Sequence, residues 1–140
     1  MADAINIFTY GSLMFPQVWQ KVVRGDYRSS SASIHGFRRV CVLYANHPAL
    51  IISARDTPIL GRVYFQVSVE DIARLDYFET RAYERVSVAV TIDADATAAQ
   101  TYLAIDMDLL TDTDWSAQTF EKTGLPVFLA TYAVKNRPPD

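Results

Sequence analysis

Apolar and polar residues alternate along several short stretches of the chain, and this pattern predicts β-strands. Residues 83–92 are the clearest case, because every second residue from Val86 to Ile92 is valine or isoleucine and falls on one face of a strand. Strands are also expected over residues 5–10, 32–44, 49–55, 60–67 and 100–105, where β-branched and aromatic residues are frequent.

The remaining pattern predicts a few helices, over residues 15–24, 69–78, 114–122 and 126–134. Pro16 and Gly25 suit the beginning and end of the first of these helices. Ser68 is a good N-cap for the second, with Asp71 in its first turn. Many short strands with a few helices predict an α+β fold, in which one twisted sheet curls into a small mixed β-barrel.

The size and composition of the chain fit a single domain. It has 140 residues, half of them apolar, and contains no repeat, long linker or low-complexity block. We therefore expect one domain over residues 1–140, with residues 136–140 as a flexible tail.

Charge and segment composition exclude several classes of partner. The net charge is −3 and the basic residues are scattered, so nothing predicts a nucleic-acid surface. The N-terminus lacks the basic start and long apolar core of a signal peptide, and no apolar run would span a bilayer. These features predict a cytoplasmic protein without a membrane partner. They leave its oligomeric state open.

Several reactive residue types have no pattern that predicts chemistry. Cys41 is the one cysteine and lies in an apolar run, which favours a buried structural thiol. The acidic residues within 106–112 lack the spacing of a metal site and are expected in a solvated loop. His35 and His47 are expected to be structural or exposed. No metal site is predicted.

Glu79 is the carboxylate whose position in the pattern is unusual. At 100° per residue, a helix that reaches Glu79 directs it between Ile72 and Leu75 on the apolar side. Burial there would raise the pKa of the carboxyl, as a proton carrier at neutral pH requires. Alternatively, the helix ends before Glu79, which then lies in a solvated turn or pairs with Arg81 or Arg85. This segment alone favours a structural role.

A second unusual feature is the tight turn Tyr10-Gly11-Ser12-Leu13 after the first strand. Such a turn can direct successive backbone N–H groups at an anion, especially when a helix begins next. The alternative is a plain turn with Tyr10 in the core. The turn is not a nucleotide phosphate loop, because it lacks the glycine-rich pattern and its lysine.

Taken together, the sequences FTYGSLM near the N-terminus and LDYFETRAYERVSV in mid-chain resemble the gamma-glutamylcyclotransferase-like family. Between them, SASIHGFRRV resembles the second strand of that family and LGRVYFQVS the strand that leads into its helix. The order and spacing agree from about Ile5 to Ile105. Thr80 departs from the pattern, since many relatives have glycine directly after the glutamate.

The resemblance implies a barrel with a ligand cavity at one end and an enzyme that needs no metal or organic cofactor. The implied reaction cuts a γ-glutamyl amide while the glutamyl group closes to 5-oxoproline. Glu79 would be the catalytic acid and base. The substrate, a small γ-glutamyl compound, would contact the remaining site residues, which are Tyr10, Gly11, Ser12, Leu13, Tyr83 and Arg85.

Two other functions are compatible with the same residues. A non-catalytic module could bind a small anionic metabolite in the cavity, with Glu79 as a polar contact. A hydrolase could use Asp76 and Glu79 as a carboxylate pair, although no pattern of sugar-stacking aromatic residues accompanies them. The leaving group of the expected cyclotransferase is not indicated by the sequence.

Overall fold

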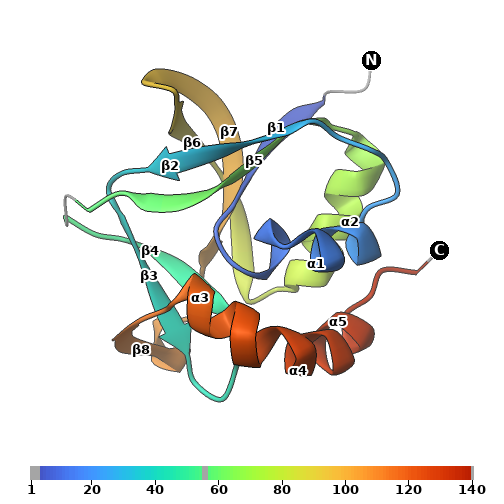
Figure 1. Cartoon of the computed structure of the whole chain (residues 1–140), viewed down its shortest axis with the longest axis vertical. Helices are drawn as coiled ribbons and strands as arrows, with labels where there is room; N and C mark the ends of the chain where they lie inside the picture. Colours follow the sequence, from blue (N-terminus) through green and yellow to red (C-terminus); the bar gives the residue numbers. More distant parts are fainter. Residues whose placement is uncertain (1–3, 55–56, 140) are drawn as a thin grey trace.

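The protein is built around a closed five-stranded β-barrel, as the alternation predicts. The computed structural model describes residues 4–54 and 57–139. The strand order is β1-β5-β2-β6-β7, with β7 returning to β1 in a parallel pair (Figure 1). The strands are β1 (Ile5–Thr9), β2 (Ser29–Ile34), β5 (Ile59–Val67), β6 (Tyr83–Ile92) and β7 (Asp95–Ala104). The prediction of a small α+β barrel is therefore confirmed.

A second sheet lies outside the barrel and corrects two predictions. The single strand expected over residues 32–44 is wrong, because the chain turns at Gly36, whose φ of 85° suits glycine. Residues 110–114 form a strand rather than a solvated loop. The order of this small sheet is β4-β3-β8, formed by β3 (Phe37–Val42), β4 (Pro48–Ile52) and β8 (Leu110–Asp114).

The strand β8 could not be found from apolar alternation, because most of its residues are polar and exposed. It is held instead by pairing with β3 and by Arg38. The Arg38 guanidinium forms ion pairs with Asp112 at 2.5 Å and with Asp114 at 2.7 Å.

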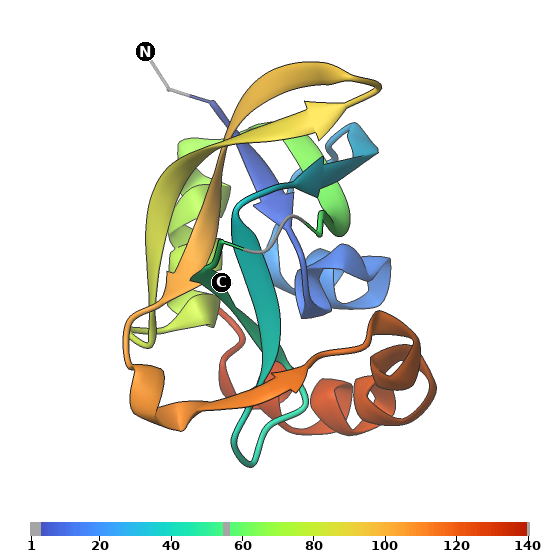
Figure 2. The same cartoon turned by 90° about the vertical axis from the view of Figure 1, so that its left-hand side faces the viewer.

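Helices cover one side and one end of the barrel. Pro16 begins α1 (Pro16–Val22), and the Ser68 hydroxyl accepts the Asp71 N–H at 3.2 Å to cap α2 (Val69–Glu79). The C-terminal helices gather at the end of the molecule opposite the N-terminus in both views (Figures 1 and 2). The remaining helical segments are η1 (Ser12–Met14), η2 (Met107–Leu109), α3 (Ala117–Thr119), η3 (Phe120–Gly124), α4 (Leu125–Ala130) and α5 (Tyr132–Lys135).

Two apolar clusters fill the structure. One lies inside the barrel and contains Phe8, Tyr10 and Val63; the other joins the helices to the barrel wall. Gly61 lets the strands close, because a Cβ there would lie 2.2 Å from the Thr9 carbonyl oxygen. Cys41 is half-buried, and burial raises the pKa of its thiol. Within the described residues, no helix is long and apolar enough to cross a membrane.

Candidate active site

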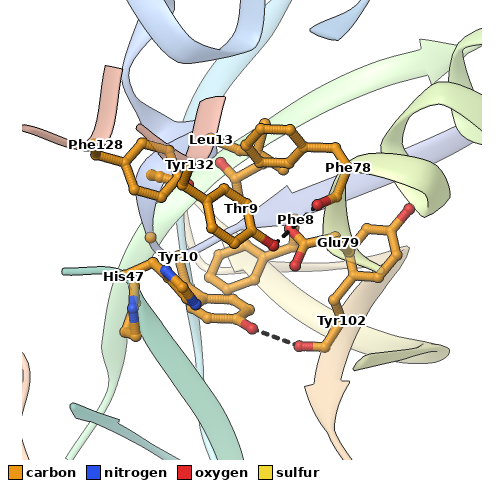
Figure 3. Close-up of a pocket in the computed structure, with 13 residues that line it drawn as sticks. Phe8, Thr9, Tyr10, Leu13, His47, Phe78, Glu79, Tyr102, Phe128 and Tyr132 are labelled. Atoms are coloured by element: carbon orange, nitrogen blue, oxygen red, sulfur yellow. Dashed lines mark hydrogen bonds between the residues drawn. The ribbon is translucent and has the colours of Figure 1, made fainter. Parts of the chain in front are cut away.

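Glu79 lies at the end of α2 and lines a pocket at one end of the barrel (Figure 3). The alternative that placed it in a solvated turn is therefore wrong. Thr80 ends the helix with φ of 68° and donates its N–H to the Asp76 carbonyl at 3.1 Å. This left-handed conformation is one that glycine adopts without penalty, which gives a physical reason for glycine at this position in relatives.

The pocket brings together residues from β1, the turn that follows it, α2, β7, the β3–β4 loop and the C-terminal helices. Its central space measures about 30 Å³, room for about one water molecule. Its walls are formed by Phe8, Thr9, Tyr10, Gly11, Ser12, Leu13, His47, Pro48, Phe78, Glu79, Tyr102, Phe128 and Tyr132.

The Glu79 carboxyl is half-buried, and no counter-charge pairs with it in the part of the chain that the structure describes. Burial, and then the nearby charge of Asp76, raises its pKa from 4.5 to about 8. The described cations include none in an ion pair with Glu79, so the predicted alternative of pairing with Arg81 or Arg85 is wrong. At neutral pH the carboxyl therefore holds its proton in most molecules and releases it readily.

Four tyrosine side chains surround this carboxyl without donating to it. Burial is the main cause of the raised pKa of each phenol, and the charge of Glu79 adds to it. Their hydroxyls donate elsewhere: Tyr10 to the Tyr102 carbonyl (2.6 Å), Tyr102 to the Asp76 carboxylate (2.6 Å), Tyr132 to the Phe78 carbonyl (3.0 Å) and Tyr83 to the Pro48 carbonyl (3.1 Å). Because these hydroxyls donate to other acceptors, the tyrosines do not stabilise the ionised form of Glu79 by hydrogen bonds.

The turn after β1 lines the same pocket and carries backbone donors that lack partners among the described residues. Gly11, Ser12 and Leu13 are buried, and their N–H groups have no acceptor among the described residues. Buried N–H groups without partners are rare in proteins. Gly11 is required here, because a Cβ would lie 2.7 Å from the Pro48 ring. Tyr10 does pack in the barrel core, as the plain-turn alternative held, and its ring also forms one wall of the pocket.

Tyr83 and Arg85 lie beside this pocket rather than in its wall. They line a neighbouring hollow of about 320 Å³ together with Asp76, Thr80 and Tyr102. The Arg85 guanidinium binds the Asp76 carboxylate through Nε at 3.0 Å and Nη2 at 3.3 Å, and also bonds Gln100. Asp76 is thus occupied by Arg85 and Tyr102, which argues against a catalytic pair of Asp76 with Glu79.

Sequence reasoning missed the opposite wall of the pocket. His47, expected to be structural or exposed, lines the pocket with its ring 4.7 Å from that of Tyr132 and 5.8 Å from that of Phe128. Burial lowers the pKa of His47 to about 4, so the imidazole is neutral at pH 7. Phe128 and Tyr132 are four residues apart in the predicted C-terminal helix and so lie on one face of it. No local signal in the sequence indicated that this face packs over the pocket.

Most of the pocket residues fall within a region of recognisable similarity to known proteins, and Phe128 and Tyr132 lie beyond it. Residues 7–117 match the model of the family described as gamma-glutamyl cyclotransferase, AIG2-like. AIG2-like protein D of Arabidopsis thaliana is 32% identical over 87 residues, which are 62% of this chain and 57% of that protein. AIG2-like protein A of the same plant is 26% identical over 132 residues, covering 91% of this chain and 78% of that protein. A solution structure of another Arabidopsis thaliana protein superposes with a TM-score of 0.69 and 24% identity, covering 99% and 96% of the two chains.

Proposed function

Because this chain belongs to the gamma-glutamyl cyclotransferase, AIG2-like family, we propose that it is a γ-glutamyl cyclotransferase. It would cleave the γ-amide of a small γ-glutamyl compound and release 5-oxoproline with a free amine. One observation supports the proposal: Glu79, whose carboxyl has a raised pKa, lines the same pocket as Gly11, Ser12 and Leu13, and neither the carboxyl nor these three N–H groups have a partner within the described ranges.

The reaction is intramolecular, so positioning supplies much of the rate. The α-nitrogen of the substrate attacks its own γ-carbonyl carbon, the ring C–N bond forms, and the bond to the leaving nitrogen breaks. Glu79 removes a proton from the α-ammonium group and delivers one to the departing amine. A carboxyl with pKa of about 8 exchanges protons in both directions near neutrality.

The N–H groups of Gly11, Ser12 and Leu13 form the anion cradle in this proposal. They would hold negatively charged oxygen, either the substrate α-carboxylate or the oxyanion that develops at the γ-carbon. The apolar rings of Phe8, Phe78 and Phe128 in the wall limit access of water, which strengthens such hydrogen bonds.

Substrate entry requires the pocket to open, because about 30 Å³ cannot contain a glutamyl group. His47 and Tyr132 line the inner pocket and also an outer hollow of about 270 Å³. Displacement of these two rings would join the two spaces. The glutamyl group would then take the inner position and the leaving amine the outer one.

The test is a direct product assay. The protein is incubated with a panel of γ-glutamyl amines, γ-glutamyl amino acids and glutathione, and 5-oxoproline is measured by mass spectrometry. Wild-type protein should form product from at least one panel member. Glu79→Gln should form none while keeping the native fold, and Glu84→Gln, an exposed glutamate on β6, should retain wild-type activity.

Full activity of Glu79→Gln would remove Glu79 from the chemistry. Saturable binding of panel compounds without any turnover would instead favour the non-catalytic binding module.

A further inference from the structure

A positively charged side chain lies directly behind the anion cradle. Arg39 on β3 donates from Nη1 to the Tyr10 carbonyl at 2.8 Å and to the Leu60 carbonyl at 3.2 Å. Its guanidinium also lies over the Trp115 ring, 5.0 Å from the ring centre. Arg39 is absent from the pocket wall, so any influence on a ligand acts through the residues that it binds.

This cation is poorly compensated. Its Nε is buried and has no hydrogen-bond partner among the described residues, which also offer it no carboxylate in an ion pair. Burial lowers the pKa of Arg39, although the charge of Asp114 opposes this effect. The preceding residue, Arg38, differs because it pairs with Asp112 and Asp114. A partly buried charge without an ion pair is costly to desolvate, so its hydrogen bonds to the Tyr10 and Leu60 carbonyls call for a functional explanation.

The geometry of one peptide unit supplies a reason. The Tyr10 carbonyl, which Arg39 binds, and the Gly11 N–H belong to the same peptide group. The described residues contain no cis peptide, and in a planar trans unit the C=O and N–H point in opposite directions. Arg39 lies outside the pocket wall and Gly11 lies in it, so a carbonyl held toward Arg39 would leave the Gly11 N–H directed toward the pocket. A cationic donor on the carbonyl also polarises the unit and strengthens its N–H as a donor.

We infer that Arg39 is a positioning residue for the anion cradle, which aims and polarises the Tyr10–Gly11 peptide toward bound anionic oxygen. Its kinetic consequence rests on the proposed function; its structural consequence at Gly11 does not. The two consequences are therefore tested separately.

The first measurement is the ¹⁵N chemical shift of the Gly11 amide, which responds to hydrogen bonding at the preceding carbonyl. Arg39→Met should shift the Gly11 signal, because the carbonyl loses its donor. Arg39→Lys, which keeps a charge and a donor, should return the signal toward the wild-type position. Arg38→Met is the matched control, since Arg38 bonds to β8 rather than to the turn, and should leave the Gly11 signal in place.

The second measurement is kcat/KM per folded molecule on whichever panel compound the wild type converts. We expect Arg39→Met to lower it by about tenfold or more, the range for loss of a hydrogen bond to a charged group, and Arg39→Lys to recover part of the loss. A rise in KM alone would indicate that the cradle holds the substrate carboxylate. A fall in kcat would indicate the oxyanion.

An unchanged Gly11 signal in Arg39→Met, or kcat/KM within twofold of the wild type, would overturn the inference. If Arg39→Met does not fold, Arg39→Gln is measured against the same two limits, because glutamine keeps a polar amide at this position but removes the positive charge that polarises the peptide. If the wild type converts no panel compound, the proposed function fails, and titration of 5-oxoproline against the Gly11 signal replaces the kinetics. Equal binding by the wild type and Arg39→Met would then refute the positioning role.

Discussion

Replacement of Glu79 by glutamine should change how the stability of the fold depends on pH. Glu79 has an ordinary pKa of 4.5 in the unfolded chain and about 8 in the folded protein. Below pH 4.5 the carboxyl is protonated in both states, so its full contribution to stability is present. Between pH 4.5 and 8 only the folded state keeps the proton, so stability falls as pH rises through this window. Glutamine has no such dependence.

The magnitude follows from the same two values. An interval from 4.5 to about 8, at about 1.36 kcal/mol for each pH unit, gives a loss of about 5 kcal/mol as an upper bound. The carboxyl is half-buried, and solvent at the pocket mouth screens it, so we expect about 3 kcal/mol. Wild type and Glu79→Gln should therefore have similar free energies of unfolding at pH 4, whereas the variant should be more stable by about this amount at pH 8.5.

The assay is urea-induced unfolding of both proteins at half-unit steps from pH 4 to pH 9. The difference between the two curves isolates Glu79, because other titrating groups are shared. His47 is one such group: its pKa is lowered to about 4, so its contribution is lost as pH falls from 6.5, and this loss cancels in the difference. Parallel curves across the whole range would refute the conclusion that Glu79 is a buried, unpaired carboxyl.

Three further changes test the surroundings of Glu79. Asp76→Asn should lower the pKa of Glu79 and move the acid limb of the kcat/KM–pH profile to lower pH. Arg85→Gln removes the cation that neutralises Asp76, so it should raise the pKa of Glu79 and move the acid limb to higher pH. Shifts in the same direction would contradict this electrostatic coupling. Gly11→Ala should lower activity at least about tenfold and the free energy of unfolding by about 1–3 kcal/mol, because the alanine Cβ would lie 2.7 Å from the Pro48 ring. The product assay measures the activity and urea unfolding the stability, and a variant that is both stable and active would contradict the prediction. Lys135 lines the outer hollow of about 270 Å³ and a second hollow of about 490 Å³, each of which also includes His47 and Tyr132. Lys135→Glu should therefore lower kcat/KM about two- to fivefold for γ-glutamyl amino acids relative to γ-glutamyl amines without a carboxylate. Equal effects on both substrate classes would exclude a contact with the leaving group.

The parts of the fold and site that depend on local sequence were predictable. The helical period directed Glu79 toward the apolar side of α2, and the glycine turn indicated free N–H groups, because both features arise from neighbouring residues. The period could not show whether the helix reached Glu79. That depends on Thr80 accepting a left-handed conformation at the helix end.

The parts that depend on distant contacts were not predictable. The sequence pattern over residues 32–44 predicted one continuous strand. The turn at Gly36 divides it because β2 pairs with β5 in the barrel, whereas β3 pairs with β4 in the second sheet. His47 and Tyr132 meet over the site from segments 85 residues apart in the numbering, a pairing without a local signal. The family resemblance placed Arg85 at the substrate site and the alternative paired it with Glu79, but Asp76 provides the carboxylate that it binds.

The groups of this site that lack partners match the charges of one kind of molecule. Among the residues that the structure describes, no cation pairs with Glu79 and no acceptor binds the N–H groups of Gly11, Ser12 and Leu13, although each feature is unfavourable on burial without a partner. In the proposed reaction a γ-glutamyl substrate brings an ammonium group and anionic oxygen on one short chain, so a single ligand satisfies both. Binding would stabilise the ionised Glu79 through the ammonium group and thereby prepare it to accept the proton. The same charge that destabilises the free protein above neutral pH would then serve as the base once substrate is bound.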